Sequence, residues 1–180
     1  MNREKKRLTE DEARRIRADG QVTVAMNYIR ERRDAEALRM FDDVLGDDPG
    51  NERATMGRCL ALGRLGRYDE ALAVLGKVLK ENPRNARAYD IRASIHEYMG
   101  DPERARADFE RSIALDPEGA EHHYNFACYW AAQGDAERCR ASLAEALRLD
   151  PASHTYAATD VDLERYRTEE WFQDLVAFKK

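Results

Sequence analysis

"ENPRN", residues 81–85, is the most informative stretch of this chain, because close variants of it return at a constant interval. The variants are "DDPGN" at 47–51, "LDPEG" at 115–119 and "LDPAS" at 149–153. Their prolines stand 34 residues apart each time, at Pro49, Pro83, Pro117 and Pro151. Proline disfavours helix in the residue before it, and Asn51 or Asn85 two positions later can cap a following helix. The motif therefore predicts the joint between repeated helical units.

Each 34-residue period contains two helical patterns that a glycine turn separates. In the period at 86–119, Gly100 can take the left-handed conformation that ends a first helix. Asp101 can then cap a second helix, and Pro102 fits its first turn, where a missing N–H group costs nothing. Gly66 and Gly134 occupy the equivalent position in the neighbouring periods, whereas Arg32 occupies it in the first period. The period therefore predicts a helix–turn–helix unit that stacks on its neighbours.

The composition is that of a chain that can bury a substantial core. Of the 180 residues, 43% are hydrophobic and 36% are charged. The net charge is −5, and acidic and basic residues are well mixed along the chain. Such mixing creates no strong positive field that would attract nucleic acid. The charged first residues lack the apolar stretch of a secretory signal, and no apolar run of transmembrane length follows. Three cysteines without a compact disulfide spacing indicate reduced thiols. We therefore expect a cytoplasmic protein that has no membrane partner.

A helix–turn–helix period of 34 residues is typical of the tetratricopeptide repeat, and the chain resembles that family over residues 18–153. "GRYDEALAVLGKVLKENPRN" at 66–85 is the strongest single match. The resemblance implies an all-α, right-handed superhelical solenoid of tetratricopeptide repeats with terminal capping helices. It places the four repeats at 18–51, 52–85, 86–119 and 120–153. The small residue of the first helix corresponds to Ala25, Cys59, Ala93 and Ala127, and the bulky residue of the second to Phe41, Leu75, Phe109 and Leu143.

The two ends of the array are expected to carry caps, because a terminal repeat would otherwise leave one apolar side in water. Residues 1–17 form a charged extension in which Thr9 and Glu12 make a capping box that starts a short helix, and we expect disorder before Thr9. Residues 154–180 are similar to the closing segment that ends many bacterial tetratricopeptide arrays, which implies C-terminal capping helices. Their apolar cover would come from Leu163, Tyr166, Trp171, Phe172 and Leu175, although Trp171 and Phe172 could instead dock a partner.

The family resemblance implies that the first helices of the repeats line a concave groove in which a partner protein binds. The predicted groove residues are Val22, Met26, Ile29, Met56, Leu60, Arg87, Asp90, Glu97 and Tyr124. The apolar members in the first two repeats could anchor a peptide or an amphipathic helix. Alternatively, the N-terminal helix covers Met26 and Met56, or two copies pair there as a homodimer. The charged members of the later repeats could select a charged peptide or could form a solvated face.

No catalytic or metal-binding constellation is found. The histidines lack HExxH or paired CxxC motifs, so we expect no metal, no cofactor and no enzymatic activity. His96 and His123 are expected inside their repeats and His122 on the surface, and Cys128 has no neighbouring histidine that would make it a nucleophile. The resulting hypothesis is a non-catalytic protein–protein interaction scaffold. The alternatives are an accessory or assembly subunit of a larger complex and, less favoured by the acidic inner positions, an RNA-binding helical repeat protein.

Overall fold

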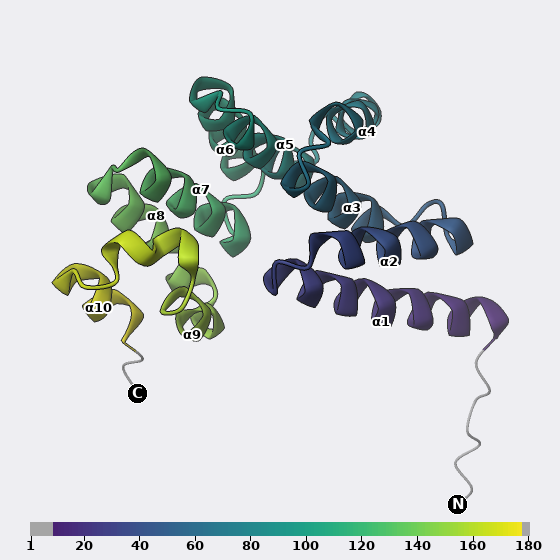
Figure 1. Ribbon diagram of the computed structural model, residues 1–180, viewed down its shortest axis with the longest axis horizontal. Coiled ribbons are helices and arrows are strands. Elements are labelled where there is room, and N and C mark those ends of the chain that lie inside the picture. The colour runs from purple at the N-terminus through teal and green to yellow at the C-terminus, as the bar shows by residue number, and fades with distance from the viewer. Residues whose placement is uncertain (1–8, 178–180) are drawn as a thin grey trace, which may run out of the picture. The chain divides into compact units, whose positions relative to one another are not determined.

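The computed structural model describes residues 9–177 and consists of helices joined by short turns, without a strand in that range (Figure 1). The disorder expected before Thr9 concerns residues outside this range. The chain divides into two compact units, Met1–Ala71 and Leu72–Lys180. Helix α4 (Tyr68–Glu81) contains the boundary between them. The all-α fold class that the sequence predicts is therefore confirmed.

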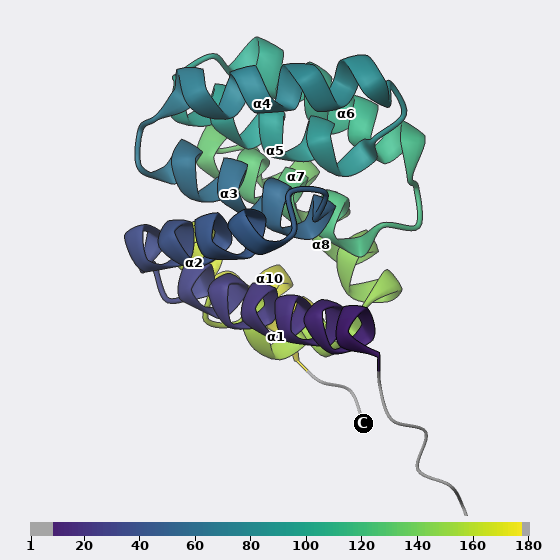
Figure 2. The same ribbon diagram turned by 90° about the vertical axis from the view of Figure 1, so that its right-hand side faces the viewer.

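The first unit contains α1 (Glu10–Arg30), α2 (Asp34–Asp47) and α3 (Glu52–Arg64). Helix α2 packs against both α1 and α3, and Figures 1 and 2 show it lying alongside α1. Helix α3 begins at the predicted joint, where the side chain of Asn51 accepts a hydrogen bond from the Ala54 N–H group at 3.0 Å. At this joint the proline motif therefore ends α2, and its asparagine caps α3, as these residues predict.

The capping box at Thr9 is present, but it starts a long helix rather than a short one. The Glu12 N–H group donates to Thr9 Oγ1 at 3.2 Å, and the Thr9 N–H group donates to the Glu12 carboxylate at 2.8 Å. Helix α1 then continues without a break for 21 residues into the first repeat. Its arginines, glutamates and alanines are strong helix formers, and the single Gly20 costs only about 1 kcal/mol. The predicted separate capping helix is therefore the first part of α1.

The second unit contains two helix pairs, α5 (Ala86–Tyr98) with α6 (Pro102–Leu115) and α7 (Ala120–Gln133) with α8 (Ala136–Leu149). Helix α7 also contacts α5 and α6 of the preceding pair. Asn85 caps α5 through the Ala88 N–H group, and Asp101 caps α6 with Pro102 as its first residue. The two helices of each predicted repeat in this unit therefore pack against each other.

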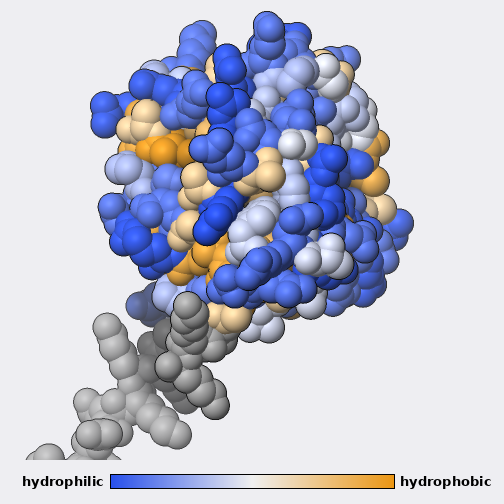
Figure 3. Space-filling view, turned by 90° about the vertical axis from the view of Figure 1, so that its left-hand side faces the viewer, coloured by the Kyte–Doolittle hydropathy of each residue, from blue (hydrophilic) through white to orange (hydrophobic). Residues whose placement is uncertain are grey.

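The C-terminal segment closes the second unit with η1 (Pro151–Ser153), α9 (His154–Ala157), η2 (Val161–Tyr166) and α10 (Glu170–Val176). Leu163, Tyr166 and Phe172 are buried in one core cluster with residues of α7 and α8, and Trp171 and Leu175 pack against that cluster. Three of the five predicted cover residues are thus core residues, and the other two pack on its edge. On the side where α8 and α10 lie, the surface is mostly hydrophilic with small apolar patches (Figure 3). The segment therefore covers an apolar side of α7 and α8, and its role as the end cap of the array stays a prediction.

The turn inside each helix pair needs one residue in the left-handed conformation. Gly66, Gly100 and Gly134 take it with φ of 75°, 75° and 79°, and Arg32 takes it in the first repeat with φ of 61°. A side chain at this φ brings Cβ close to the following carbonyl oxygen, which costs about 1–2 kcal/mol. Arg32 therefore carries backbone strain that the equivalent glycines avoid.

Replacing Arg32 with glycine should raise the free energy of unfolding by about 1 kcal/mol, because it removes this strain. Urea denaturation of the wild type and of Arg32→Gly measures the change. The reverse replacement, Gly100→Ala, should lower stability by a similar amount. An unchanged or lower stability of Arg32→Gly would show that contacts of the arginine side chain outweigh the strain.

Helices α2 and α3 approach so closely at Gly57 that no side chain fits there. A Cβ atom at this position would overlap the ring of Phe41, which is completely buried. By contrast, the space around Gly20 in α1 is open. The large residue of one helix therefore packs directly against the backbone of the next.

Gly57→Ala should destabilise the protein by about 1–3 kcal/mol, because the buried ring has no free space to move into. Gly20→Ala should stabilise it by about 0.5–1 kcal/mol, since alanine loses less conformational entropy in a helix. Thermal and urea unfolding of the two variants test this pair. Equal effects of the two substitutions would contradict the tight approach.

Candidate functional site

Four of the predicted groove residues occupy one equivalent position in successive repeats, and all four are interior. Val22 and Met56 are completely buried, and only 3% of Asp90 and 9% of Tyr124 is exposed. We call these four residues the packing set. Ile29 is also buried. These five side chains support the helices in this structure, and their contact with a partner stays a prediction.

The position four residues later in each first helix has a different environment. Met26, Leu60, Ser94 and Cys128 occupy it, and each is half-buried. We call these four residues the inner set. None of them is charged, although charged residues make up 36% of the chain. The inner set therefore offers partly accessible, uncharged side chains at a repeated position.

Arg87 belongs to a third equivalent position, which is occupied by Asp19, Arg53, Arg87 and Glu121. Within the first unit Arg53 pairs with Asp19 at 3.2 Å, and within the second unit Arg87 lies 3.9 Å from Glu121. Such exposed pairs contribute little to stability. They do, however, place an acid beside each of the two arginines, so neither presents an isolated positive charge.

Asp90 belongs to a buried polar network between α5 and α7. Its carboxylate accepts a hydrogen bond from Asn125 Nδ2 at 2.7 Å and lies 3.6 Å from His122 Nδ1. Burial raises the pKa of Asp90. Burial opposes protonation of His122, but the Asp90 carboxylate outweighs it and raises the pKa of the imidazole. This contact links neighbouring repeats.

His122 was expected on the surface, and that prediction is wrong because only 2% of its side chain is exposed. It occupies the repeat position of Ala54 and Ala88, which are also buried. The position is therefore interior in three repeats. His123 is half-buried, and its Nε2 atom lies 2.9 Å from the Pro117 carbonyl oxygen.

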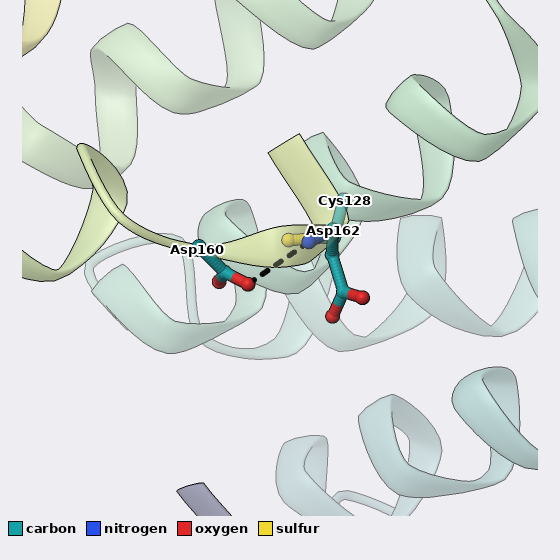
Figure 4. Close-up of side chains that lie close together, drawn as sticks. All are labelled: Cys128, Asp160 and Asp162. Carbon is teal, nitrogen blue, oxygen red and sulfur yellow. Dashed lines mark hydrogen bonds between the residues drawn. The ribbon is translucent and has the colours of Figure 1, made fainter. Parts of the chain in front are cut away.

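The groove residue Glu97 belongs to a patch that the C-terminal segment completes. The members of this tyrosine–acid patch are Glu97 on α5, Tyr124 and Cys128 on α7, Tyr156 on α9, Asp160 and Asp162. Figure 4 shows Cys128, Asp160 and Asp162 together, and their ligating atoms all lie within 4.8 Å of one another. Tyr124 donates its hydroxyl proton to Asp160 at 2.7 Å, and its ring lies 5.5 Å from that of Tyr156.

Sequence reasoning assigned the residues after 153 to the cap, with Trp171 and Phe172 as alternative partner contacts, and missed Tyr156, Asp160 and Asp162. One signal was available, because Asp162 follows Cys128 by the same 34 residues that separate the members of the inner set. Asp160 and Tyr156 carry no such signal. Their place beside α7 depends on how the irregular segment folds back.

Negative charge and burial shift several pKa values in the patch. Burial, with a smaller effect of the Asp162 carboxylate, raises the pKa of Glu97 to about 7. Burial and the surrounding carboxylates raise the pKa of the Cys128 thiol well above its usual range and that of Tyr156 to about 12. In the described part of the chain, no salt bridge to a basic side chain compensates Glu97.

The geometry of the patch disfavours both nucleophilic chemistry and a tight metal centre. A nucleophilic cysteine needs its thiolate form, whereas the raised pKa keeps Cys128 protonated. Both oxygens of Asp160 already accept hydrogen bonds, from the Tyr124 hydroxyl and from the Asp162 N–H group at 3.1 Å. Cys59 and Cys139 are buried, and burial raises the pKa of each to about 12.

Glu97→Gln should stabilise the protein at pH 8 by about 1–2 kcal/mol, allowing for solvent screening. The pKa rises from 4.5 to about 7 on folding, so the folded state binds more protons and loses stability as pH increases through this window. Glutamine removes that loss, and the gain should disappear near pH 4.5. Urea unfolding of both proteins from pH 4.5 to 8 tests the effect, and a gain independent of pH would contradict it.

Comparisons with known proteins agree with the helical repeat. Two models of the tetratricopeptide repeat family match residues 28–95 and 92–154. No curated protein matches the chain. In residues 9–177, no helix is long and apolar enough to cross a membrane.

Solved structures of similar fold share only low sequence identity with this chain. TTC0263, a thermophilic TPR protein of Thermus thermophilus, is 19% identical with a TM-score of 0.67, over 88% of this chain and 86% of that one. A crystal structure of MamA is 17% identical with a TM-score of 0.53, over 85% of this chain and 88% of that one. These similarities concern the fold alone. Together with the two matching family models, they show that the chain belongs to the tetratricopeptide repeat family.

Proposed function

We propose that this protein is a non-catalytic interaction module that binds a peptide or an amphipathic helix of another protein, with Met26 and Leu60 as the contacts that the first unit contributes. The observation that carries the proposal is the partial exposure of Met26 and Leu60, two uncharged residues at the same repeat position of the first unit. Stacked helix pairs use extended surfaces of this kind for binding. Membership of the tetratricopeptide repeat family supports protein interaction as the general role.

We further propose, on the basis of their burial, which of the nine predicted groove residues contact the partner. Met26, Leu60, Arg87 and Glu97 are half-buried and can touch a partner. The remaining five, namely Val22, Ile29, Met56, Asp90 and Tyr124, are buried and hold the first helices in place. Covering a large aliphatic side chain completely contributes about 1.5–3 kcal/mol, so Met26 and Leu60 can each supply part of that amount. Methionine also adapts to different partner shapes.

A nucleic-acid partner fits the same residues less well. A phosphate backbone is bound through uncompensated lysine and arginine side chains. Arg53 and Arg87 each lie beside a carboxylate of the same unit, and the tyrosine–acid patch adds negative charge. We therefore propose a protein partner.

Leu60→Glu should weaken peptide binding at least tenfold, which corresponds to about 1.4 kcal/mol, while leaving the protein folded. The probes are peptides selected on the wild-type protein from a random library, and fluorescence anisotropy measures their affinity. Val24→Glu is the matched control, because Val24 is an exposed apolar residue of α1 outside the inner set.

Met56→Ala distinguishes a residue that stabilises the helices from one that contacts the peptide. This buried residue should lose about 2–5 kcal/mol of stability on truncation, with peptide affinity unchanged in the folded fraction. If Leu60→Glu binds the peptides like the wild type and Val24→Glu does not, the binding surface lies elsewhere on the first unit.

A further inference from the structure

His122 lies between two carboxylates where α5 contacts α7 in the second unit. Its Nδ1 atom is 3.6 Å from the carboxylate of Asp90 on α5, and its Nε2 atom is 3.7 Å from that of Asp116, which follows α6. Only 2% of His122 and 3% of Asp90 is exposed, whereas the Asp116 side chain is exposed. Water can therefore hydrate Asp116, but Asp90 depends on protein groups to compensate its charge.

Neighbouring groups fix the two buried side chains in this arrangement. A Cβ atom at Gly119 would overlap both the His122 ring and the Asp116 carboxylate, so the contact has room only because a glycine stands there. Asn125 donates a hydrogen bond from Nδ2 to one oxygen of Asp90 at 2.7 Å. The other Asp90 oxygen faces His122 Nδ1, and neither atom has another hydrogen-bond partner in residues 9–177. Each of these two atoms therefore depends on the other.

Charged side chains are unusual at these two positions of the repeat. His122 occupies the position of Ala54 and Ala88 in the two preceding repeats, and Asp90 occupies the position of Met56. Those three residues are apolar and completely buried. A buried ion pair adds little net stability over apolar residues of similar volume, but one buried charge without its partner is strongly unfavourable. The α5–α7 contact therefore depends on whether the pair keeps its proton.

The charged groups around the pair favour a protonated imidazole. Burial opposes protonation of His122, but Asp90 on α5, Glu121 on α7 and Asp116 outweigh it and raise the pKa of the imidazole. Burial also raises the pKa of Asp90, against the effect of His122. The nearest basic group is Arg87 on α5, which lies 3.9 Å from Glu121. Both pKa shifts make the folded pair hold its proton more firmly than the unfolded chain does.

We propose that His122 is a pH-sensitive link between α5 and α7, which joins them as an imidazolium and loosens their contact as a neutral imidazole. Loss of the proton leaves the Asp90 carboxylate buried with only Asn125 as a hydrogen-bond donor. Because the pKa of His122 is raised by folding, the stabilisation is complete below the ordinary histidine pKa of 6.5. It is lost as the pH increases through the pKa of the folded imidazole. This property lies in the second unit and does not depend on partner binding.

The first measurement is the titration of the His122 ring protons by NMR in the full chain. The pKa should lie above 6.5 in the wild type, and Asp90→Asn should shift it downward, because burial then opposes protonation without the facing carboxylate. His123, which is half-buried beside the pair, provides the reference titration. A wild-type pKa at or below 6.5, or one that Asp90→Asn leaves unchanged, would overturn the proposal.

Hydrogen exchange then measures the contact itself. Glu97 on α5 also ionises near pH 7, so these measurements use Glu97→Gln as the parent protein to remove that effect. In this parent, opening of the α5 and α7 amides should become about threefold more frequent, or more, from pH 6 to pH 8.5 after correction for intrinsic exchange rates. Opening that does not increase over this range would contradict a pH-sensitive link.

A double variant replaces the pair by the residues of the equivalent positions. Asp90→Met with His122→Ala copies Met56 and Ala88, which are buried without charge, so it should fold and lose this pH dependence. His123→Ala, the matched control, should keep the pH dependence of the parent. An increase in opening that persists in the double variant would show that other groups cause it and would overturn the proposal. If the double variant does not fold, the titration of His122 decides.

Discussion

The left-handed turn residue between paired helices is the constraint on which the rest of the structure depends. It follows the first helix of each repeat at the same interval, at Arg32, Gly66, Gly100 and Gly134. Within the units it reverses the chain between α1 and α2, between α5 and α6, and between α7 and α8. The proline joint then starts the next pair. Because both connections recur every 34 residues, equivalent side chains acquire equivalent environments. The close contact of Phe41 with Gly57 and the burial of His122 at an alanine position are both consequences of this register.

The sequence was sufficient to predict the helices and turns, since each is determined by local chemistry. Asn85 caps α5, Asp101 caps α6, and the Thr9 capping box begins α1, all as their residues predict. The predicted boundary between a short N-terminal helix and the first repeat was wrong, and the reason is again local. Nothing between Thr9 and Arg30 breaks a helix strongly enough to create a boundary, because helix propensity falls only modestly at Gly20.

Which apolar residues reach the surface could not be predicted in the same way. Val22 and Met26, like Met56 and Leu60, are four residues apart and lie on the same side of one helix. The first member of each pair is completely buried and the second only partly. Their composition is similar, so the difference arises from packing between helices. Aligning the repeats shows which positions are equivalent but not how far each side chain is buried. The inner set therefore became apparent only in the structure.

The tyrosine–acid patch shows the same limit for charged residues. Glu97 read alone is an ordinary polar residue of a helix surface, and Asp160 and Asp162 read alone are residues of a turn and a helix start. Their joint effect appears only in the folded chain, where burial and, to a smaller extent, the Asp162 carboxylate raise the pKa of Glu97. That segment also buries Leu163 and Phe172, so the apolar contacts that close the array offset the electrostatic cost of assembling the acids.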